Sequence, residues 1–195
     1  AGSGFRGANV TVPHKQAALA AANAADANAR RIGAANTLVV GDDGRVTASN
    51  TDGYGFMENL RQGAASWQVA DGPAVVLGAG GAARAVVAAL LDAGAPEVRL
   101  VNRTLARAQG LAADLGPLTV VPWSAARDAM RGAALLVNTT ILGMVGSEPL
   151  DLDLALLPAA AVVNDIVYRP LETPLLAAAK ARGNRVVDGL GMLLH

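Results

Sequence analysis

The sequence predicts an α/β protein with a doubly wound parallel sheet, preceded along the chain by a second, partial α/β unit. From about residue 74 onward, short β-branched or Leu-rich runs alternate with amphipathic stretches, and glycines end the stretches. Apolar strands separated by helices of this length are typical of a parallel sheet covered on both faces. The first 60 residues lack this regular alternation, which favours a separate unit there.

In the regular part, a helix is expected from the glycines after residue 77 to about Ala93, and another at 105–115. A third, at 173–182, has a Thr cap, Pro174 in its first turn and Gly183 after its end. The six expected strands are 74–77, 98–101, 118–121, 134–138, 161–165 and 185–187.

In the first part, a strand at 8–12 ends at Pro13 and an Ala-rich helix is expected over 14–31. Strands at 37–40 and 45–48 flank Gly-Asp-Asp-Gly, which indicates a hairpin turn. A helix then begins near Asp52 and continues to residue 61, and 63–73 is expected to be a connection.

Composition excludes several classes of function. Sixteen basic residues balance sixteen acidic ones, so nucleic acid and anionic membranes are not expected partners. The absence of cysteine excludes disulfides and thiolate chemistry, and two histidines, His14 and His195, are too few for a His-rich metal site; no metal is expected. No apolar run approaches the roughly 18–20 residues that span a bilayer. With no signal peptide visible, we expect a cytoplasmic location.

A glycine-rich segment between the first regular strand and its helix indicates a dinucleotide site. Residues 78–83 have the G-x-G-x-x-A pattern of a Rossmann domain, which is specific only in a strand–turn–helix context such as this one. Gly78 would make the tight turn, and Gly80 would let the backbone approach a pyrophosphate at the helix N-terminus. Besides these, the residues expected at the phosphates are Ala79, Gly81 and Ala82.

The end of the second regular strand predicts which cofactor binds. An NAD site places a carboxylate there, but this chain has Asn102, Arg103 and Thr104. The guanidinium of Arg103 can bind a 2′-phosphate, with Arg107 one turn further on, so NADP(H) is expected. The alternative is a solvated basic start of a helix.

Lys15 and Asp52 are the candidates for acid/base chemistry. A hydride-transfer enzyme needs a group that stabilises or protonates the carbonyl oxygen as charge develops on it. Lys15 follows a strand that ends at a proline, and Asp52 lies where an extended segment meets a helix. A lysine beside a carboxylate could donate and accept a proton. From spacing alone, a solvated lysine and a helix cap are the more ordinary interpretation.

Seven segments, in the same order along the chain, resemble the motifs of the shikimate dehydrogenase family, and together they span nearly the whole sequence. The first has the pattern G-x-N-V-T-x-P-x-K. The segments are 7–15, 33–38, 50–53, 78–82, 102–104, 165–174 and 188–192.

This resemblance implies an NADP-dependent oxidoreductase that reversibly reduces 3-dehydroshikimate to shikimate, in chorismate and aromatic amino-acid biosynthesis. By position, it makes Lys15 the catalytic acid/base and Asp52 its partner on the substrate hydroxyls. The other expected substrate contacts are Thr11, Asn36 and Tyr168. Ile166 and Gly189 are expected to line the nicotinamide end of the cofactor site.

The resemblance also implies a domain division. We expect residues 1–53, with 189–195 returning to them, to form a partial substrate-binding and catalytic domain, and 54–188 to form the NADP-binding domain. The family's N-terminal Ser-x-Ser motif and a C-terminal glutamine that contacts substrate have no counterpart, so a piece of a longer protein is expected. A monomer or homodimer acting on a small molecule is expected. The alternatives are a quinate/shikimate dehydrogenase and a non-catalytic, ligand-sensing regulator of the same fold.

Overall fold

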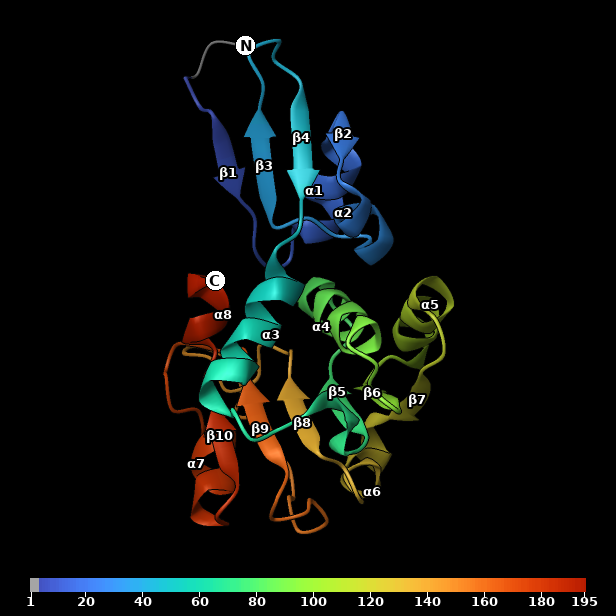
Figure 1. Cartoon of the computed structure of the whole chain (residues 1–195), viewed down its shortest axis with the longest axis vertical. Coiled ribbons are helices and arrows are strands. Elements are labelled where there is room, and N and C mark those ends of the chain that lie inside the picture. Colours follow the sequence, from blue (N-terminus) through green and yellow to red (C-terminus); the bar gives the residue numbers. More distant parts are fainter. Residues whose placement is uncertain (1–3) are drawn as a thin grey trace.

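The computed structural model describes residues 4–195 and has two lobes joined by α3 (Figure 1). The small lobe (4–51) carries a four-stranded sheet and the large lobe (52–195) a six-stranded sheet. The small-lobe elements are β1 (Gly7–Asn9), α1 (Lys15–Ala21), β2 (Ala24–Ala25), α2 (Ala27–Ile32), β3 (Thr37–Val40) and β4 (Val46–Ser49).

The large lobe is an alternation of helices and strands. Its helices are α3 (Asp52–Gly63), α4 (Gly81–Asp92), α5 (Leu105–Leu115), α6 (Ala126–Ala129), α7 (Pro174–Ala181) and α8 (Leu190–Leu194), with 3₁₀ turns η1 (Val69–Asp71) and η2 (Trp123–Ala125). Its strands are β5 (Ala74–Leu77), β6 (Val98–Asn102), β7 (Thr119–Pro122), β8 (Leu135–Asn138), β9 (Val162–Asp165) and β10 (Arg185–Val187).

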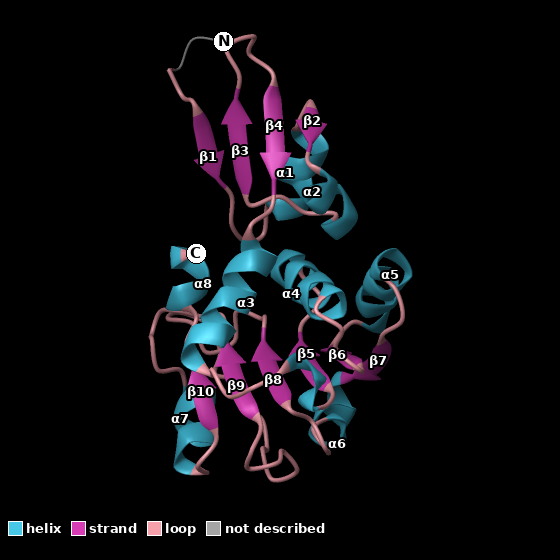
Figure 2. Ribbon diagram, viewed as in Figure 1, coloured by secondary structure: helices cyan, strands magenta, loops and turns pink. Residues whose placement is uncertain are grey.

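The six strands of the large lobe are all parallel, in the order β10-β9-β8-β5-β6-β7. Alternate residues of β5 face opposite sides: Val76 packs beneath α3, α4 and α5, whereas Val75 packs against α6 and α7. Helices therefore cover both faces of the sheet (Figure 2). The predicted Rossmann-type fold is confirmed, and all six expected strands are present within one residue or two of their predicted limits.

The predicted helix over 14–31 is wrong: the segment forms two helices separated by β2. Asn23 accepts a hydrogen bond from the backbone N–H of Val46 through Oδ1, at 2.8 Å. Residues 24–25 then pair with β4, and the carboxylate of Asp26 caps α2 by accepting from the N–H of Ala29 at 2.6 Å. Tertiary pairing with β4 therefore overrides the helix propensity of the alanines.

Other differences from the predicted elements are smaller. The expected strand over 8–12 ends at Asn9, because the chain turns before α1 and His14 N–H donates to the carbonyl of Thr11. The hairpin turn after β3 is confirmed, with Gly44 at φ +76°. Sequence periodicity did not predict β2, α6 or α8, which are two to five residues long.

The two lobes touch along α4. Ile32 and Ala34 of the small lobe form a buried cluster with Ala85 and Ala88 of α4. Gly53, in the first turn of α3, also lies close to α4: a Cβ there would stand 3.1 Å from the carbonyl oxygen of Ala85. This contact brings the start of α3 beside the start of α4. Within the described part of the chain, residues 4–195, no helix has the length and apolar character that a membrane crossing requires.

Candidate active site

Lys15 and Asp52 form an ion pair where the two lobes meet. Lys15 is the first residue of α1 and Asp52 the first residue of α3. Lys15 Nζ lies 2.5 Å from Asp52 Oδ2, and the two side chains are only 10% and 11% exposed. The structure thus brings together two residues that are 37 positions apart in the sequence. A buried ammonium beside a carboxylate is the arrangement that proton transfer to a bound substrate requires.

Two asparagines bind Asp52, one at its carboxylate and the other at its backbone N–H. Asn36 Nδ2 donates to Asp52 Oδ1 at 3.0 Å. Asn50 Oδ1 accepts from the backbone N–H of Asp52 at 3.0 Å, while its amide donates to the carbonyl of Ala34. Asn36 therefore orients the carboxylate, and Asn50 fixes the backbone at the start of α3. The sequence predicted Asn36 as a substrate contact, and its bond to Asp52 is an additional finding.

The glycine loop, residues 78–81, lies directly beside Lys15. Gly78 has φ +101°, and a Cβ there would stand 3.0 Å from both Thr139 Oγ1 and Thr140 Cγ2, so the turn requires glycine. A Cβ on Gly81 would stand 3.1 Å from Cβ of Lys15. The N-terminus of α4 and the ammonium-bearing residue are therefore neighbours.

The glycine loop has the geometry that a bound pyrophosphate needs. Gly80 is the N-cap of α4, and no side chain of the described residues caps this helix. The first N–H groups of a helix have no intrahelical acceptor, and they carry partial positive charge. Around Gly80 the space is open, with no described atom within 4 Å of where a Cβ would stand. The loop therefore fits the phosphates of a dinucleotide.

The residues expected at the 2′-phosphate lie next to this loop. The N–H of Gly78 donates to the carbonyl of Val101 in the adjacent strand β6, which ends at Asn102. Asn102 Nδ2 donates to the carbonyl of Thr104 at 2.8 Å and so shapes the turn into α5. Arg103 and Arg107 are exposed, and neither forms an ion pair among residues 4–195. Their guanidinium groups are free to bind an anionic group.

A buried polar network closes the carboxyl ends of β8 and β9. Asp165 Oδ1 accepts from Asn138 Nδ2 at 2.9 Å and from the N–H of Val167 at 3.0 Å, and Oδ2 accepts from the hydroxyl of Thr173 at 2.7 Å. Burial raises the pKa of Asp165, and the three hydrogen bonds oppose that rise. The network fixes the loop that carries Ile166 and Tyr168.

The remaining predicted residues are placed as follows. Ile166 and Gly189 are neighbours, since a Cβ on Gly189 would clash with the carbonyl oxygen of Ile166. Thr11 and Tyr168 are exposed, and neither donates nor accepts a side-chain hydrogen bond with Lys15 or Asp52 in the described residues. Sequence reasoning did not predict the hydrogen bonds that Asn138 and Thr173 donate to Asp165, and it did not single out Arg84, a buried charge in α4. A lone arginine among the alanines of α4 was the available signal.

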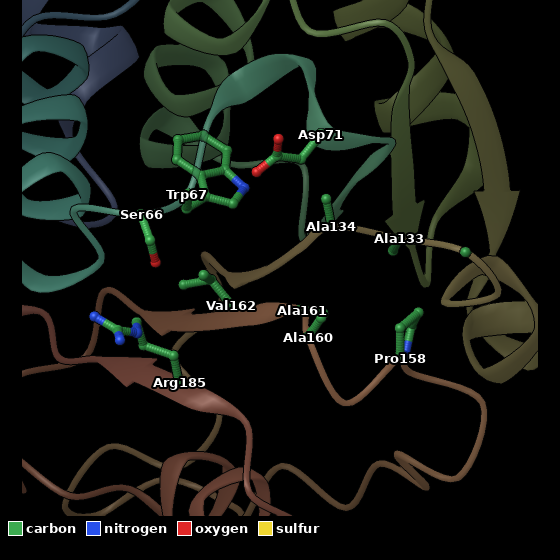
Figure 3. Close-up of a pocket in the computed structure, with 11 residues that line it drawn as sticks. Ser66, Trp67, Asp71, Ala133, Ala134, Pro158, Ala160, Ala161, Val162 and Arg185 are labelled. Carbon is green, nitrogen blue, oxygen red and sulfur yellow. The ribbon is translucent and has the colours of Figure 1, made fainter.

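A cavity of about 440 Å³ lies at the opposite edge of the large sheet (Figure 3). Its lining includes Trp67, Asp71 and Arg185, together with residues that precede β8 and β9. This is the amino edge of the strands, whereas open parallel sheets bind ligands at the carboxyl edge. The glycine loop and the Lys15–Asp52 pair lie at the carboxyl edge, and we place the candidate site there. Among the described residues, no group of three or more His, Asp or Glu side chains could hold a metal ion.

Comparison with known proteins gives two family matches. A model described as the shikimate dehydrogenase substrate binding domain matches residues 1–38, and one described as shikimate / quinate 5-dehydrogenase matches residues 61–142. A shikimate dehydrogenase (NADP(+)) of Paramagnetospirillum magneticum is 65% identical over 193 residues, which are 98% of this chain and 70% of that protein. The enzyme of the same name from Rhodospirillum rubrum is 60% identical, with the same shares covered.

Solved structures agree with these matches. Shikimate 5-dehydrogenase of Thermus thermophilus, in complex with NADP(H) and shikimate, superposes with a TM-score of 0.83 at 46% identity, covering 98% of this chain and 69% of that one. Quinate dehydrogenase of Corynebacterium glutamicum, in complex with NAD, gives a TM-score of 0.88 at 33% identity, covering 98% and 70%.

Proposed function

From the premise that this chain belongs to the shikimate dehydrogenase family, we propose that it catalyses the reversible, NADPH-dependent reduction of 3-dehydroshikimate to shikimate. It is an NADP-dependent oxidoreductase with a Rossmann-type domain and a small-molecule substrate. The observation that carries the proposal is the Lys15–Asp52 ion pair, 2.5 Å long, beside the glycine loop.

In this proposal Lys15 is the general acid. The cofactor, NADPH, would supply a hydride to the substrate carbonyl carbon. As negative charge develops on the carbonyl oxygen, the Lys15 ammonium donates its proton to that oxygen, which becomes the hydroxyl of shikimate. In the reverse direction the neutral amine accepts the hydroxyl proton. Burial of the pair strengthens this interaction by excluding water.

Asp52 orients both Lys15 and the substrate. One carboxylate oxygen accepts from Lys15 and the other from Asn36, so the group is held in a single orientation. A carboxylate accepts hydrogen bonds from vicinal hydroxyls, which shikimate carries. We assign Thr11, Asn36 and Tyr168 as further substrate contacts.

The chain's own residues supply a fitting cofactor site. We propose that backbone N–H groups of Gly78, Ala79, Gly80, Gly81 and Ala82 bind the pyrophosphate, because the helix N-terminus behind them lacks a side-chain cap among the described residues. The turn formed by Asn102, Arg103 and Thr104 would bind the 2′-phosphate together with Arg107. Ile166 and Gly189, which are in contact, would flank the nicotinamide.

The proposed domains are 1–53 and 54–188, with residues 189–195 returning toward the first. The contacts that α8 makes with α3, Met192 with Gly55 and Gly191 with Asn59, lie on the 54–188 side of this division. The cytoplasmic location and the monomeric or homodimeric state stay predictions from the sequence.

A turnover assay on the full-length gene product tests the function. Shikimate and quinate are each offered with NADP⁺ and with NAD⁺. We expect the pair of shikimate and NADP⁺ to give the largest kcat/KM. A preference for quinate with NAD⁺ would identify the alternative that the Corynebacterium quinate dehydrogenase illustrates. Binding of shikimate without turnover would favour the ligand-sensing regulator instead.

A further inference from the structure

Arg84 is a buried cation that joins the two lobes. It lies in the first turn of α4, directly after the glycine loop, and is 8% exposed. Its Nε donates to the carbonyl of Ile32 in the small lobe, and its Nη2 lies 2.5 Å from Asp114 Oδ2 on α5. Because a buried charge is costly unless it is paired and hydrogen-bonded, this side chain is held in one place by both partners.

The small-lobe partner of Arg84 is the C-terminus of α2. Ile32 is the last residue of that helix, whose free carbonyls carry partial negative charge. Gly33 follows with φ +71°, and a Cβ there would stand 2.8 Å from Arg84 Nη2. Glycine at this position therefore allows the guanidinium plane to lie directly against the backbone of the turn.

The segment that Arg84 holds leads to both members of the acid/base pair. In residues 33–36, the N–H of Ala35 donates to the carbonyl of Lys15 at 2.9 Å. Asn36, at the end of this segment, donates to Asp52 Oδ1 at 3.0 Å. The first turn of α4 is thus connected, through residues 33–36, to the backbone of Lys15 and to the carboxylate of Asp52.

We propose that Arg84 is a positioning residue, which sets the position of the Lys15–Asp52 pair relative to the glycine loop by binding the Ile32 carbonyl, directly before the 33–36 turn. This inference rests on the proposed function, because it assumes that the pair acts on a substrate beside a dinucleotide. Arg84 itself touches neither. Its effect is geometric: a misplacement of about 1 Å can cost roughly 10²-fold in rate.

The kinetic test compares Arg84→Met with a matched control. Arg31→Gln also removes an ion pair between the lobes, Arg31 to Asp92, but that pair is exposed and neither side chain forms a hydrogen bond with the described residues 33–36. We expect Arg84→Met to lower kcat roughly 10- to 100-fold, with a higher KM for shikimate. The deuterium isotope effect on kcat, measured with shikimate deuterated at the carbon that gives up the hydride, should increase because hydride transfer becomes limiting. Arg31→Gln should leave all three unchanged.

A merely structural role predicts a different pattern. Partial unfolding lowers the concentration of active enzyme, and so lowers the apparent kcat, but it leaves KM and the isotope effect as in the wild type. Arg84→Lys and Asp114→Asn supply variants with smaller perturbations. The lysine can reach only one of the two partners, and the asparagine leaves the Arg84–Ile32 bond in place. We expect both to fall between the wild type and Arg84→Met.

Hydrogen exchange supplies a readout that does not depend on activity. In Arg84→Met, the amides of Ala35 and Asn36 should exchange at least 10-fold faster, while those of β5 stay as in the wild type. If the wild-type protein showed no turnover, the proposed function would be wrong. The exchange result would still decide whether Arg84 orders the 33–36 turn. Unchanged exchange at 33–36, or an Arg84→Met enzyme with wild-type KM and isotope effect, would overturn the positioning role.

Discussion

In the large lobe, β5, β8 and β9 are buried along their whole length, whereas in the small lobe β1 is exposed at every position. The large sheet has helices on both faces and forms two apolar clusters of its own. None of the small sheet's described residues belongs to either cluster, and Ile32 at the end of α2 and Ala34 in the turn after it pack against α4 of the other lobe. The large lobe is therefore ordered by its own core, and the small lobe is ordered in part by its contact with the large one.

This difference matters for the site, because the two lobes supply different parts of it. The glycine loop and the arginines expected at the 2′-phosphate come from the large lobe. Lys15 and Asn36 come from the small lobe, and Asp52 lies at the junction. With the proposed assignments, the geometry of the reaction depends on the contact between the lobes, and the residues that bind the cofactor belong to the large lobe.

The largest expected effect is that of Lys15→Ala on turnover. Removing the proton donor should lower kcat roughly 10²- to 10⁴-fold, with a small change in shikimate binding. The affinity for NADP⁺, measured by fluorescence titration, should stay within about twofold, because the large lobe holds the cofactor residues. Gln16→Ala, at the exposed neighbouring position, is the control. Normal turnover with lost shikimate binding would refute the role of Lys15 as the acid.

A pair of truncations separates the stability of the two lobes. Leu100 is fully buried in the large sheet, so Leu100→Ala should lower the free energy of unfolding by about 2–5 kcal/mol. Val39 in β3 is 52% exposed, and Val39→Ala should change the free energy of unfolding by no more than about 0.5 kcal/mol. Denaturant titration followed by circular dichroism measures both. Equal losses would contradict the contrast between the sheets.

Arg103→Ala tests whether the large lobe selects the cofactor. Loss of a charge-assisted hydrogen bond to a 2′-phosphate, worth about 1.5–3 kcal/mol, should raise the Kd for NADP⁺ roughly 10- to 100-fold. The Kd for NAD⁺, which lacks that phosphate, should not change. Arg127→Ala, an exposed arginine paired with Asp153 in the same lobe, serves as the control. An unchanged ratio of the two affinities would exclude Arg103 as the phosphate ligand.

The smallest expected effect is a pH dependence from Asp165. Burial raises the pKa of this carboxyl in the folded protein, so the folded state binds the proton more tightly than the unfolded chain does. Its contribution to stability is present below the ordinary aspartate pKa and is lost as pH rises through the raised value. The difference in unfolding free energy, Asp165→Asn minus wild type, should therefore increase with pH across this window. Asp151→Asn, at an exposed site, should show no such trend.

Local patterns predicted much of the fold and less of the site. The strand–turn–helix context around Gly78, the caps of α7 and the hairpin turn depend on neighbouring residues, and they were predictable for that reason. The break between α1 and α2 was not, because it depends on pairing with β4, about twenty residues away. For the same reason the bond of Asn50 to Ala34 and that of Arg84 to Ile32 could not be predicted, because the partners are 16 and 52 residues apart in the sequence.

The sequence by itself determined the parallel sheet, the glycine loop, the family resemblance and the identity of the candidate residues, since each follows from periodicity or from a local motif. Only the tertiary structure decided that Lys15 and Asp52 are buried together, that Asn36 holds the carboxylate, and that Gly81 lies against Lys15. These contacts join segments from two lobes, and their geometry is set by the packing of the small lobe on α4. Packing between distant segments has no signature in a local pattern.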